Sequence, residues 1–335
     1  MRRIFTKILI AAVIILLVLY SVAANFMVSA ALIPDFMRKL DAFDRVTEQG
    51  YSEMVQTDEI TANTKAAREE AKEFLDKAEL KKVKILSYDG YELTAAVFEQ
   101  AEPEERPWVV LLHGYTGWKE EMYHYAARYY DKGFNILAPD LRCQGESDGD
   151  YIGMGWTDRD DVMLWVNNIL ESYPGADIVL HGESMGSSCA LMMSGLLLPD
   201  NIRCIISDCA YTDAMSMFRK QLRDWFGVPD PGLVWSARLW LMIRGGYDLK
   251  KASAIEEVRS CSVPVLFIQG DQDKIIPPEA AQELYDACAV SEQDKEIMIV
   301  EGAGHVQSCY KDPEAYYSTV FGFIGRYVNG SFVEE

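Results

Sequence analysis

Three separate segments of the sequence carry residue types that together could act on a carbonyl carbon. Ser184 lies in the segment GESMG, Asp273 in GDQDKIIPP and His305 in EGAGH. A serine hydroxyl is a weak nucleophile near neutral pH, so it needs an imidazole that accepts its proton and a carboxylate that orients the imidazole. The three residues therefore indicate attack by serine on an ester, a thioester or an amide.

The glycines on either side of Ser184 fit a sharp turn from a strand into a helix. Gly182 and Gly186 have no side chains that would clash there, and the following helix directs its free amides toward the reacting centre. The pentapeptide alone also fits a glycine-rich turn whose serine caps a helix, so the case for catalysis depends on the partners. The chain order serine, acid, histidine is the one expected for this kind of turn, with Asp273 or Asp271 as the acid.

The elements around these residues predict an α/β fold. Short apolar segments typical of buried strands alternate with helical patterns, and this alternation indicates a mainly parallel sheet. In such a sheet, side chains that follow the strands meet at the carboxyl edge. Residues 83–99 alternate in polarity around a turn and predict an antiparallel hairpin. The expected strands are 108–112, 134–138, 177–181, 202–207, 263–269 and 295–300, and the expected helices are 119–132, 157–171, 185–198, 278–290 and 312–328.

One interval is too long for an ordinary connection between strands. More than 50 residues separate Ser207 from Val263. We interpret residues 212–258 as a helical lid over the carboxyl ends of the strands. Its apolar side chains either favour an acyl or aromatic group in the substrate or bury the faces of the lid itself. They include Met215, Met217, Phe218, Trp225, Phe226, Trp235, Trp240 and Met242.

The first 33 residues have the composition of a membrane anchor. Basic residues precede 26 residues, 8–33, that carry no charge, whereas about 20 are enough to cross a bilayer. Basic residues before the span favour a cytoplasmic amino end, so we expect a single-pass protein of the cell membrane with an extracellular catalytic domain. The segment SVAA at 21–24 leaves cleavage of a signal peptide, and secretion, as the alternative.

We therefore divide the chain into three parts. Residues 1–33 form an anchor or signal segment. Residues 34–80 form a helical spacer that either packs on the main domain or separates it from the membrane. Residues 81–335 form the catalytic domain.

Composition excludes several other classes of function. The formal net charge of −20 disfavours nucleic acid as a partner, because its phosphates would be repelled. The seven cysteines form no C-x-x-C pair, so neither metal nor thioredoxin-like chemistry is indicated, and most are expected to be small buried residues. The oligomeric state stays open.

Residues 82–328 resemble the α/β-hydrolase superfamily, and within it the bacterial lid-bearing hydrolases described as lysophospholipase-like, esterase-like or serine-aminopeptidase-like. The resemblance is carried by His113-Gly114, PDLRCQGESDG at 139–149, GESMG, GDQDKIIP and GAGH. It differs at Arg142-Cys143-Gln144-Gly145, where relatives usually have Arg-Gly-His-Gly. That loop flanks the pocket and supplies none of the three residues.

The resemblance implies a role for each candidate residue. Ser184 would be the nucleophile, His305 the general base and Asp273 the orienting acid, since the family spacing before Ile-Pro favours Asp273 over Asp271. The backbone amides of Tyr115 and Met185 would form the oxyanion hole. The fold would be an eight-stranded, mainly parallel sheet flanked by helices, with a lid insertion and no metal or organic cofactor.

Several activities are compatible with this assignment. The expected substrate is a small-molecule acyl ester, including lysophospholipid-like esters; a peptidase or amidase, an acyltransferase, and a non-catalytic surface binding protein are the alternatives. His113, His181 and His124 are expected to be structural. Asp208 and Tyr211 either line the pocket or support the fold.

Overall fold

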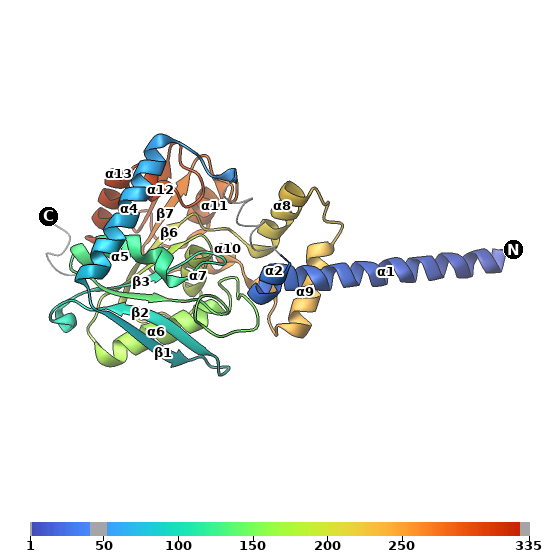
Figure 1. The fold of residues 1–335 in the computed structure, drawn as a ribbon, viewed down its shortest axis with the longest axis horizontal. Coiled ribbons are helices and arrows are strands. Elements are labelled where there is room, and N and C mark those ends of the chain that lie inside the picture. Colours follow the sequence, from blue (N-terminus) through green and yellow to red (C-terminus); the bar gives the residue numbers. More distant parts are fainter. Residues whose placement is uncertain (1, 41–51, 329–335) are drawn as a thin grey trace.

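A computed structural model of the chain describes residues 2–40 and 52–328 (Figure 1). One sheet has the strand order β1-β2-β4-β3-β5-β6-β7-β8. β1 and β2 form the expected hairpin, β2 is also antiparallel to β4, and the remaining pairs are parallel. The predicted fold class is therefore confirmed. The strands are β1 Leu80–Leu86, β2 Glu92–Phe98, β3 Trp108–Leu112, β4 Asn135–Pro139, β5 Ile178–Glu183, β6 Ile202–Asp208, β7 Val265–Gly270 and β8 Lys295–Val300.

Helices cover both faces of the sheet, which explains why the central strands are continuously apolar. Successive residues of a strand point to opposite faces. Val110 and Leu112 of β3 belong to one buried cluster with α6 and α7, whereas Val109 and Leu111 belong to a second with α5 and α13. The helices are α1 Arg2–Leu32, α2 Pro34–Lys39, α4 Asp58–Lys77, α5 Tyr123–Asp131, α6 Asp158–Ser172, α7 Met185–Met193, α8 Ala214–Phe226, α9 Leu233–Arg244, α10 Ala254–Glu257, α11 Glu279–Ala287, α12 Ser308–Lys311 and α13 Pro313–Ile324.

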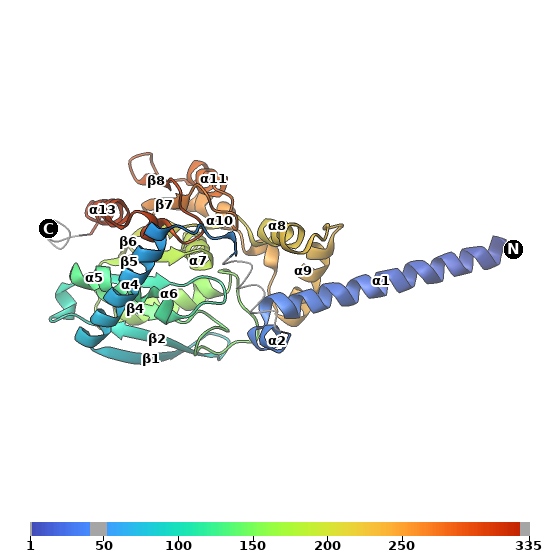
Figure 2. The same ribbon diagram turned by 45° about the horizontal axis from the view of Figure 1, so that its top comes forward.

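Helix α1 projects away from the rest of the protein (Figures 1 and 2). Among the described residues it is the one helix long and apolar enough to cross a membrane. Only 6% of its most apolar window is buried, so α1 is not a core helix of a soluble domain. Its last turns do contact the domain, since Ala24, Val28 and Leu32 are buried.

Helix α4, within the predicted spacer, packs on the main domain. The ring of Phe74 lies 4.6 Å from that of Phe98 on β2, and Nδ2 of Asn63 donates to the carbonyl of Tyr310 at 2.8 Å. Of the two arrangements expected for residues 34–80, the described part of the spacer adopts the packed one. Residues 41–51 of the spacer lie outside the described residues.

The long interval between β6 and β7 contains α8 and α9, which lie beside the domain end of α1 in both views (Figures 1 and 2). The interval begins where β6 ends at Asp208, which is the carboxyl end of that strand. This is the position expected for a segment above the carboxyl edge of the sheet.

Candidate active site

Ser184 lies on a strained turn between β5 and α7. Its φ of 51° and ψ of −116° place a non-glycine residue in a sparsely populated region, and such strain persists only where the surroundings enforce it. The backbone amide of Ser184 donates to the carbonyl of Asp208 at 2.8 Å, and its carbonyl accepts from Ser188 at 3.0 Å. The turn therefore holds the side chain above the carboxyl edge of the sheet.

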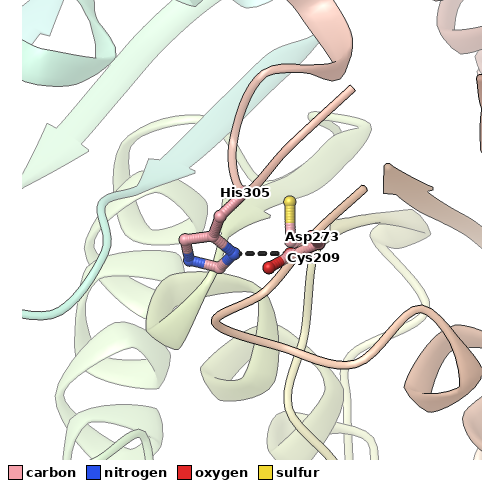
Figure 3. A group of neighbouring side chains, drawn as sticks. All are labelled: Cys209, Asp273 and His305. Atoms are coloured by element: carbon pink, nitrogen blue, oxygen red, sulfur yellow. Dashed lines mark hydrogen bonds and ion pairs between the residues drawn. The ribbon is translucent and has the colours of Figure 1, made fainter. Parts of the chain in front are cut away.

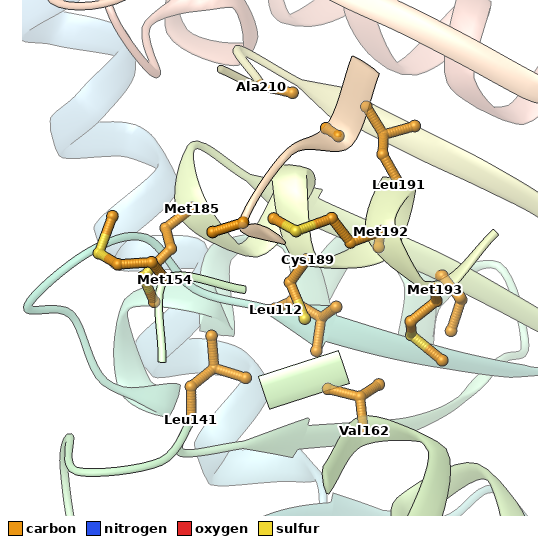
Figure 4. Close-up of a cluster of buried hydrophobic side chains, with 14 of the residues drawn as sticks. Leu112, Leu141, Met154, Val162, Met185, Cys189, Leu191, Met192, Met193 and Ala210 are labelled. Atoms are coloured by element: carbon orange, nitrogen blue, oxygen red, sulfur yellow. The ribbon is translucent and has the colours of Figure 1, made fainter. Parts of the chain in front are cut away.

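The two glycines that flank Ser184 allow α7 to lie against the sheet. A Cβ atom on Gly186 would lie 2.1 Å from the carbonyl oxygen of Leu112, and one on Gly182 would lie 2.3 Å from the backbone of Gly186. Beyond the turn, Met185 and Cys189 of α7 lie among the side chains of the core (Figure 4). Close backbone contact is thus what places the amino end of α7 beneath the serine.

Replacement of Gly186 by alanine is expected to lower the free energy of unfolding by at least about 2 kcal/mol, because the added methyl group would collide with backbone that cannot move aside. Gly175→Ala is the matched control, since a Cβ at Gly175 meets no atom within 4 Å. Urea denaturation of the two variants and the wild type would measure the difference. Equal stability of the two variants would contradict the packing argument.

His305 and Asp273 reach Ser184 from two other loops. Nε2 of His305 lies 2.9 Å from Oγ of Ser184, and Nδ1 of His305 lies 2.7 Å from Oδ2 of Asp273. Figure 3 shows the contact between the imidazole and the carboxylate. Asp273 lies in the loop after β7 and His305 in the loop after β8, so adjacent parallel strands bring the two together.

The carboxylate of Asp273 is held by further hydrogen bonds. Its Oδ1 accepts from the amides of Ile275 and Ile276 at 2.9 and 2.8 Å, and its Oδ2 also accepts from Nε2 of Gln269 at 2.8 Å. Asp271, the alternative acid, instead accepts from the amide of Gly302 at 2.6 Å. Asp271 therefore links the loop after β7 to the loop after β8, which carries His305. Asp273 is the acid that contacts the imidazole.

Cys209 lies beside this pair, and its Sγ with donor atoms of Asp273 and His305 forms a group within 4.8 Å (Figure 3). The thiol donates to Asp208 at 2.8 Å, and Nδ1 of His305 already contacts Asp273. Burial raises the pKa of Cys209 well above its usual range, which disfavours the thiolate that a metal would need. The absence of a metal from the chemistry remains a prediction.

Tyr115 and Met185, the predicted oxyanion-hole residues, lie in two segments next to Ser184. Met185 is the first residue of α7, and Tyr115 follows His113-Gly114 at the end of β3. A Cβ on Gly114 would lie 3.5 Å from Cβ of Ser184, so this loop runs directly beside the serine. The hydroxyl of Tyr115 donates to the carbonyl of Ala31 at the end of α1.

The other histidines are buried, and their rings are hydrogen-bonded to groups other than the serine. Nε2 of His113 accepts from the amide of Leu141 at 2.9 Å, and burial lowers the pKa of His113 to about 4. His181 lies 2.9 Å from the hydroxyl of Tyr129, and His124 lies 3.1 Å from that of Tyr310.

Asp208 and Tyr211 also have structural partners. Asp208 accepts from the hydroxyl of Tyr316 at 2.9 Å, and the hydroxyl of Tyr211 donates to the carbonyl of Met154 at 2.7 Å. Both side chains are buried.

Sequence reasoning missed two features of the site. Gln269, the penultimate residue of β7, binds the carboxylate of Asp273, and nothing in the apolar strand pattern marks it except its polarity. The end of α1 contacts Tyr115 and α9. The signal that could have revealed that contact is the series Ser21, Asn25 and Ser29, polar residues four apart in the uncharged part of the helix.

Comparisons with known proteins agree with this architecture. The model of a family described as "Alpha/beta hydrolase family" matches residues 109–319. The chain is 28% identical over 250 residues to "Uncharacterized protein YqkD" of Bacillus subtilis, which covers 71% of this chain and 81% of that protein. Among solved structures it is similar to the esterase Pf2001 of Pyrococcus furiosus, with a TM-score of 0.60, 24% identity, and coverage of 75% of this chain and 94% of that one. It is also similar to an acylaminoacyl peptidase of Pyrococcus horikoshii, with a TM-score of 0.56, 18% identity, and coverage of 75% and 42%. Identities this low show a shared fold.

Proposed function

The chain belongs to the alpha/beta hydrolase family, and on this premise we propose that it is a serine hydrolase that cleaves carboxylic esters. The observation that carries the proposal is the continuous hydrogen-bonded series from the hydroxyl of Ser184 through the imidazole of His305 to the carboxylate of Asp273. Similarity to esterases and to a peptidase in fold is compatible with hydrolysis of either bond.

The proposed reaction proceeds through an acyl-enzyme. Oγ of Ser184 attacks the ester carbonyl while Nε2 of His305 accepts its proton, and the amides of Met185 and Tyr115 stabilise the oxyanion that forms. The imidazolium then returns the proton to the leaving alcohol. A water molecule, deprotonated by the same imidazole, attacks the acyl-enzyme and releases the acid and the free serine.

Asp273 would hold the imidazole in the tautomer that this reaction needs. Its Oδ2 accepts the proton on Nδ1 and leaves Nε2 free to receive the proton of Ser184. The amides of Ile275 and Ile276 and the side chain of Gln269 fix the carboxylate, so the imidazole cannot turn away without losing this partner.

We place the protein at the cell membrane through an α1 that is retained. Cleavage after SVAA would remove Ser21 and Ala24. Ser21 accepts a hydrogen bond of 3.0 Å from Nε1 of Trp240, and Ala24 is buried. Contacts of the folded domain with residues before the cleavage site support an anchor over a removed signal. The segment 212–258, with α8 and α9, would serve as the lid.

A fluorophosphonate probe is expected to label the full chain at Ser184, and the rate of labelling is expected to rise with pH through a midpoint above 6.5. Burial lowers the pKa of His305, but attraction to Asp273 and the hydrogen bond between them outweigh it, so the pKa is raised from its ordinary 6.5. Only the neutral imidazole accepts a proton, so activity is lost as pH falls through that raised pKa. Quenching the reaction at intervals would give the rate of labelling at each pH, and mass spectrometry of the modified peptide would identify the labelled residue.

Two results would count against the proposal, one from the labelling and one from a comparison of the rates at which the protein hydrolyses different substrates. Folded protein that the probe does not label would indicate a binding protein with this fold. A labelled protein that hydrolyses aminoacyl amides faster than acyl esters would support the peptidase alternative.

A further inference from the structure

Helix α9 exposes a row of large apolar side chains. Trp235, Leu239, Met242 and Ile243 are 51, 37, 43 and 75% exposed, and their spacing places them on one face of the helix. Phe226, the last residue of the neighbouring α8, is 62% exposed. Single exposed apolar residues are common, but a group of five on two adjacent helices marks an interaction surface.

The rest of α9 is attached to α1. Nε1 of Trp240 donates to Oγ of Ser21 at 3.0 Å, and Nη1 of Arg244 donates to Oδ1 of Asn25 at 2.7 Å. The buried residues of α9 and of the last turns of α1 also line one shared cavity: Val28, Leu32, Val234, Ala237 and Leu241. These contacts fix α9 beside the last turns of α1, and Figure 2 shows the two helices next to each other.

The residues of α1 that α9 contacts, Ser21 and Asn25, lie within the part of α1 that is long and apolar enough to span a membrane. Counted from Ile8, the about 20 residues needed to cross the hydrocarbon core end near Met27. At about 1.5 Å per residue, Ser21 and Asn25 then lie about 9 and 3 Å inside the outer boundary. If the span is instead counted back from Ile33, Ser21 and Asn25 lie deeper in the bilayer. Helix α9 therefore lies beside lipid in either placement. The shallower one keeps the polar catalytic domain outside the membrane.

Four of the five cationic side chains of α8 and α9 are paired with carboxylates; the fifth, Arg244, instead binds Asn25 near the outer boundary and lies over the ring of Tyr151. Arg238 pairs with Asp248, and Arg219 of α8 pairs with Asp230, so these cations are neutralised within the protein. With a net charge of −20, the chain gains little from anionic headgroups. Apolar contact is the remaining attraction, and a tryptophan at this level suits the boundary between acyl chains and water.

We propose that Phe226, Trp235, Leu239, Met242 and Ile243 form a membrane-docking surface that lies in the leaflet through which α1 leaves the bilayer. The proposal rests on α1 as a membrane span and is independent of catalysis. The catalytic domain would then be held against the membrane at two places, the span itself and the exposed face of α9.

Photo-cross-linking in the full chain tests this surface. The amino acid p-benzoylphenylalanine would replace Ile243, Leu16 or Leu197 in protein reconstituted in vesicles of phosphatidylethanolamine and phosphatidylglycerol. Leu16 lies in α1 and is 65% exposed. Leu197 is 99% exposed and lies in the loop that leads into the amino end of β6, opposite the edge from which the chain runs to α8. After illumination, mass spectrometry is expected to find about tenfold more lipid adduct at positions 243 and 16 than at 197.

Each other outcome overturns the proposal. A lipid adduct at 16 but not at 243 would show a membrane span with the surface outside the lipid. Cross-links from 243 to a second copy of the chain would assign the surface to an oligomer. An absence of adduct at 16 would remove the span itself. Since the readout is a lipid adduct, it does not depend on whether the protein hydrolyses esters.

Discussion

Replacement of Ser184 by alanine is expected to lower the turnover of a short acyl ester by on the order of 10⁶. In the proposed mechanism Oγ of Ser184 is the atom that forms the acyl-enzyme, and it lies 2.9 Å from Nε2 of His305. The measurement compares kcat for a soluble p-nitrophenyl ester in the full chain, wild type and variant, in detergent.

Ser260→Ala provides the matched control. Ser260 is exposed, its hydroxyl donates to the carbonyl of Glu257 in its own turn, and its loss should leave turnover unchanged. Retention of wild-type turnover by Ser184→Ala would exclude the proposed mechanism. Circular dichroism of both variants would show that a loss of activity is not a loss of fold.

Replacement of Asp273 by asparagine is expected to lower kcat by about 10⁴-fold. The side-chain oxygen of asparagine can still accept from the amides of Ile275 and Ile276, so its NH₂ group would face Nδ1 of His305. Two donors cannot bond, and the imidazole would move its proton from Nδ1 to Nε2. Nε2 could then no longer accept the proton of Ser184, although the residues still lie in place.

Asp271→Asn separates this effect from the loss of a nearby carboxylate. Asp271 lies two residues away and accepts from Gly302, a bond that an asparagine oxygen reproduces. We expect kcat to fall by no more than about 10²-fold, the cost of a shift of about 1 Å in a catalytic group, because the imidazole and its acid stay in contact. A larger loss in Asp271→Asn than in Asp273→Asn would assign the orienting role to Asp271.

The fold class and the residues of the candidate site were readable from local pattern. Buried parallel strands must be apolar on both faces, so each strand left a continuous apolar segment, and the turn at Ser184 left glycines where side chains would collide. The chain order of Ser184, Asp273 and His305 then matched one architecture. These features are local, and local sequence records them directly.

The contacts around Asp273 and around α1 could not be read from local sequence in this way. Gln269 lies within an apolar strand, and only the pairing of β7 with β8 and the turn at Asp273 show that its amide meets the carboxylate. The lid was predicted as a segment, but its sequence did not show which apolar residues pack inward. In the structure Leu241 is buried and Ile243 is 75% exposed, although both are equally apolar in the sequence.

The sequence by itself determined which groups could react, the order of strands and helices that carries them, and the presence at the amino end of a helix long and apolar enough to cross a membrane, because each is written in residue type and periodicity. Only the tertiary structure decided that Asp273 rather than Asp271 meets the imidazole, and that α9 lies along the last turns of α1. Those outcomes depend on contacts between residues far apart in the chain, such as Trp240 with Ser21, and the free energy of such contacts is set by the whole packing arrangement rather than by any one segment.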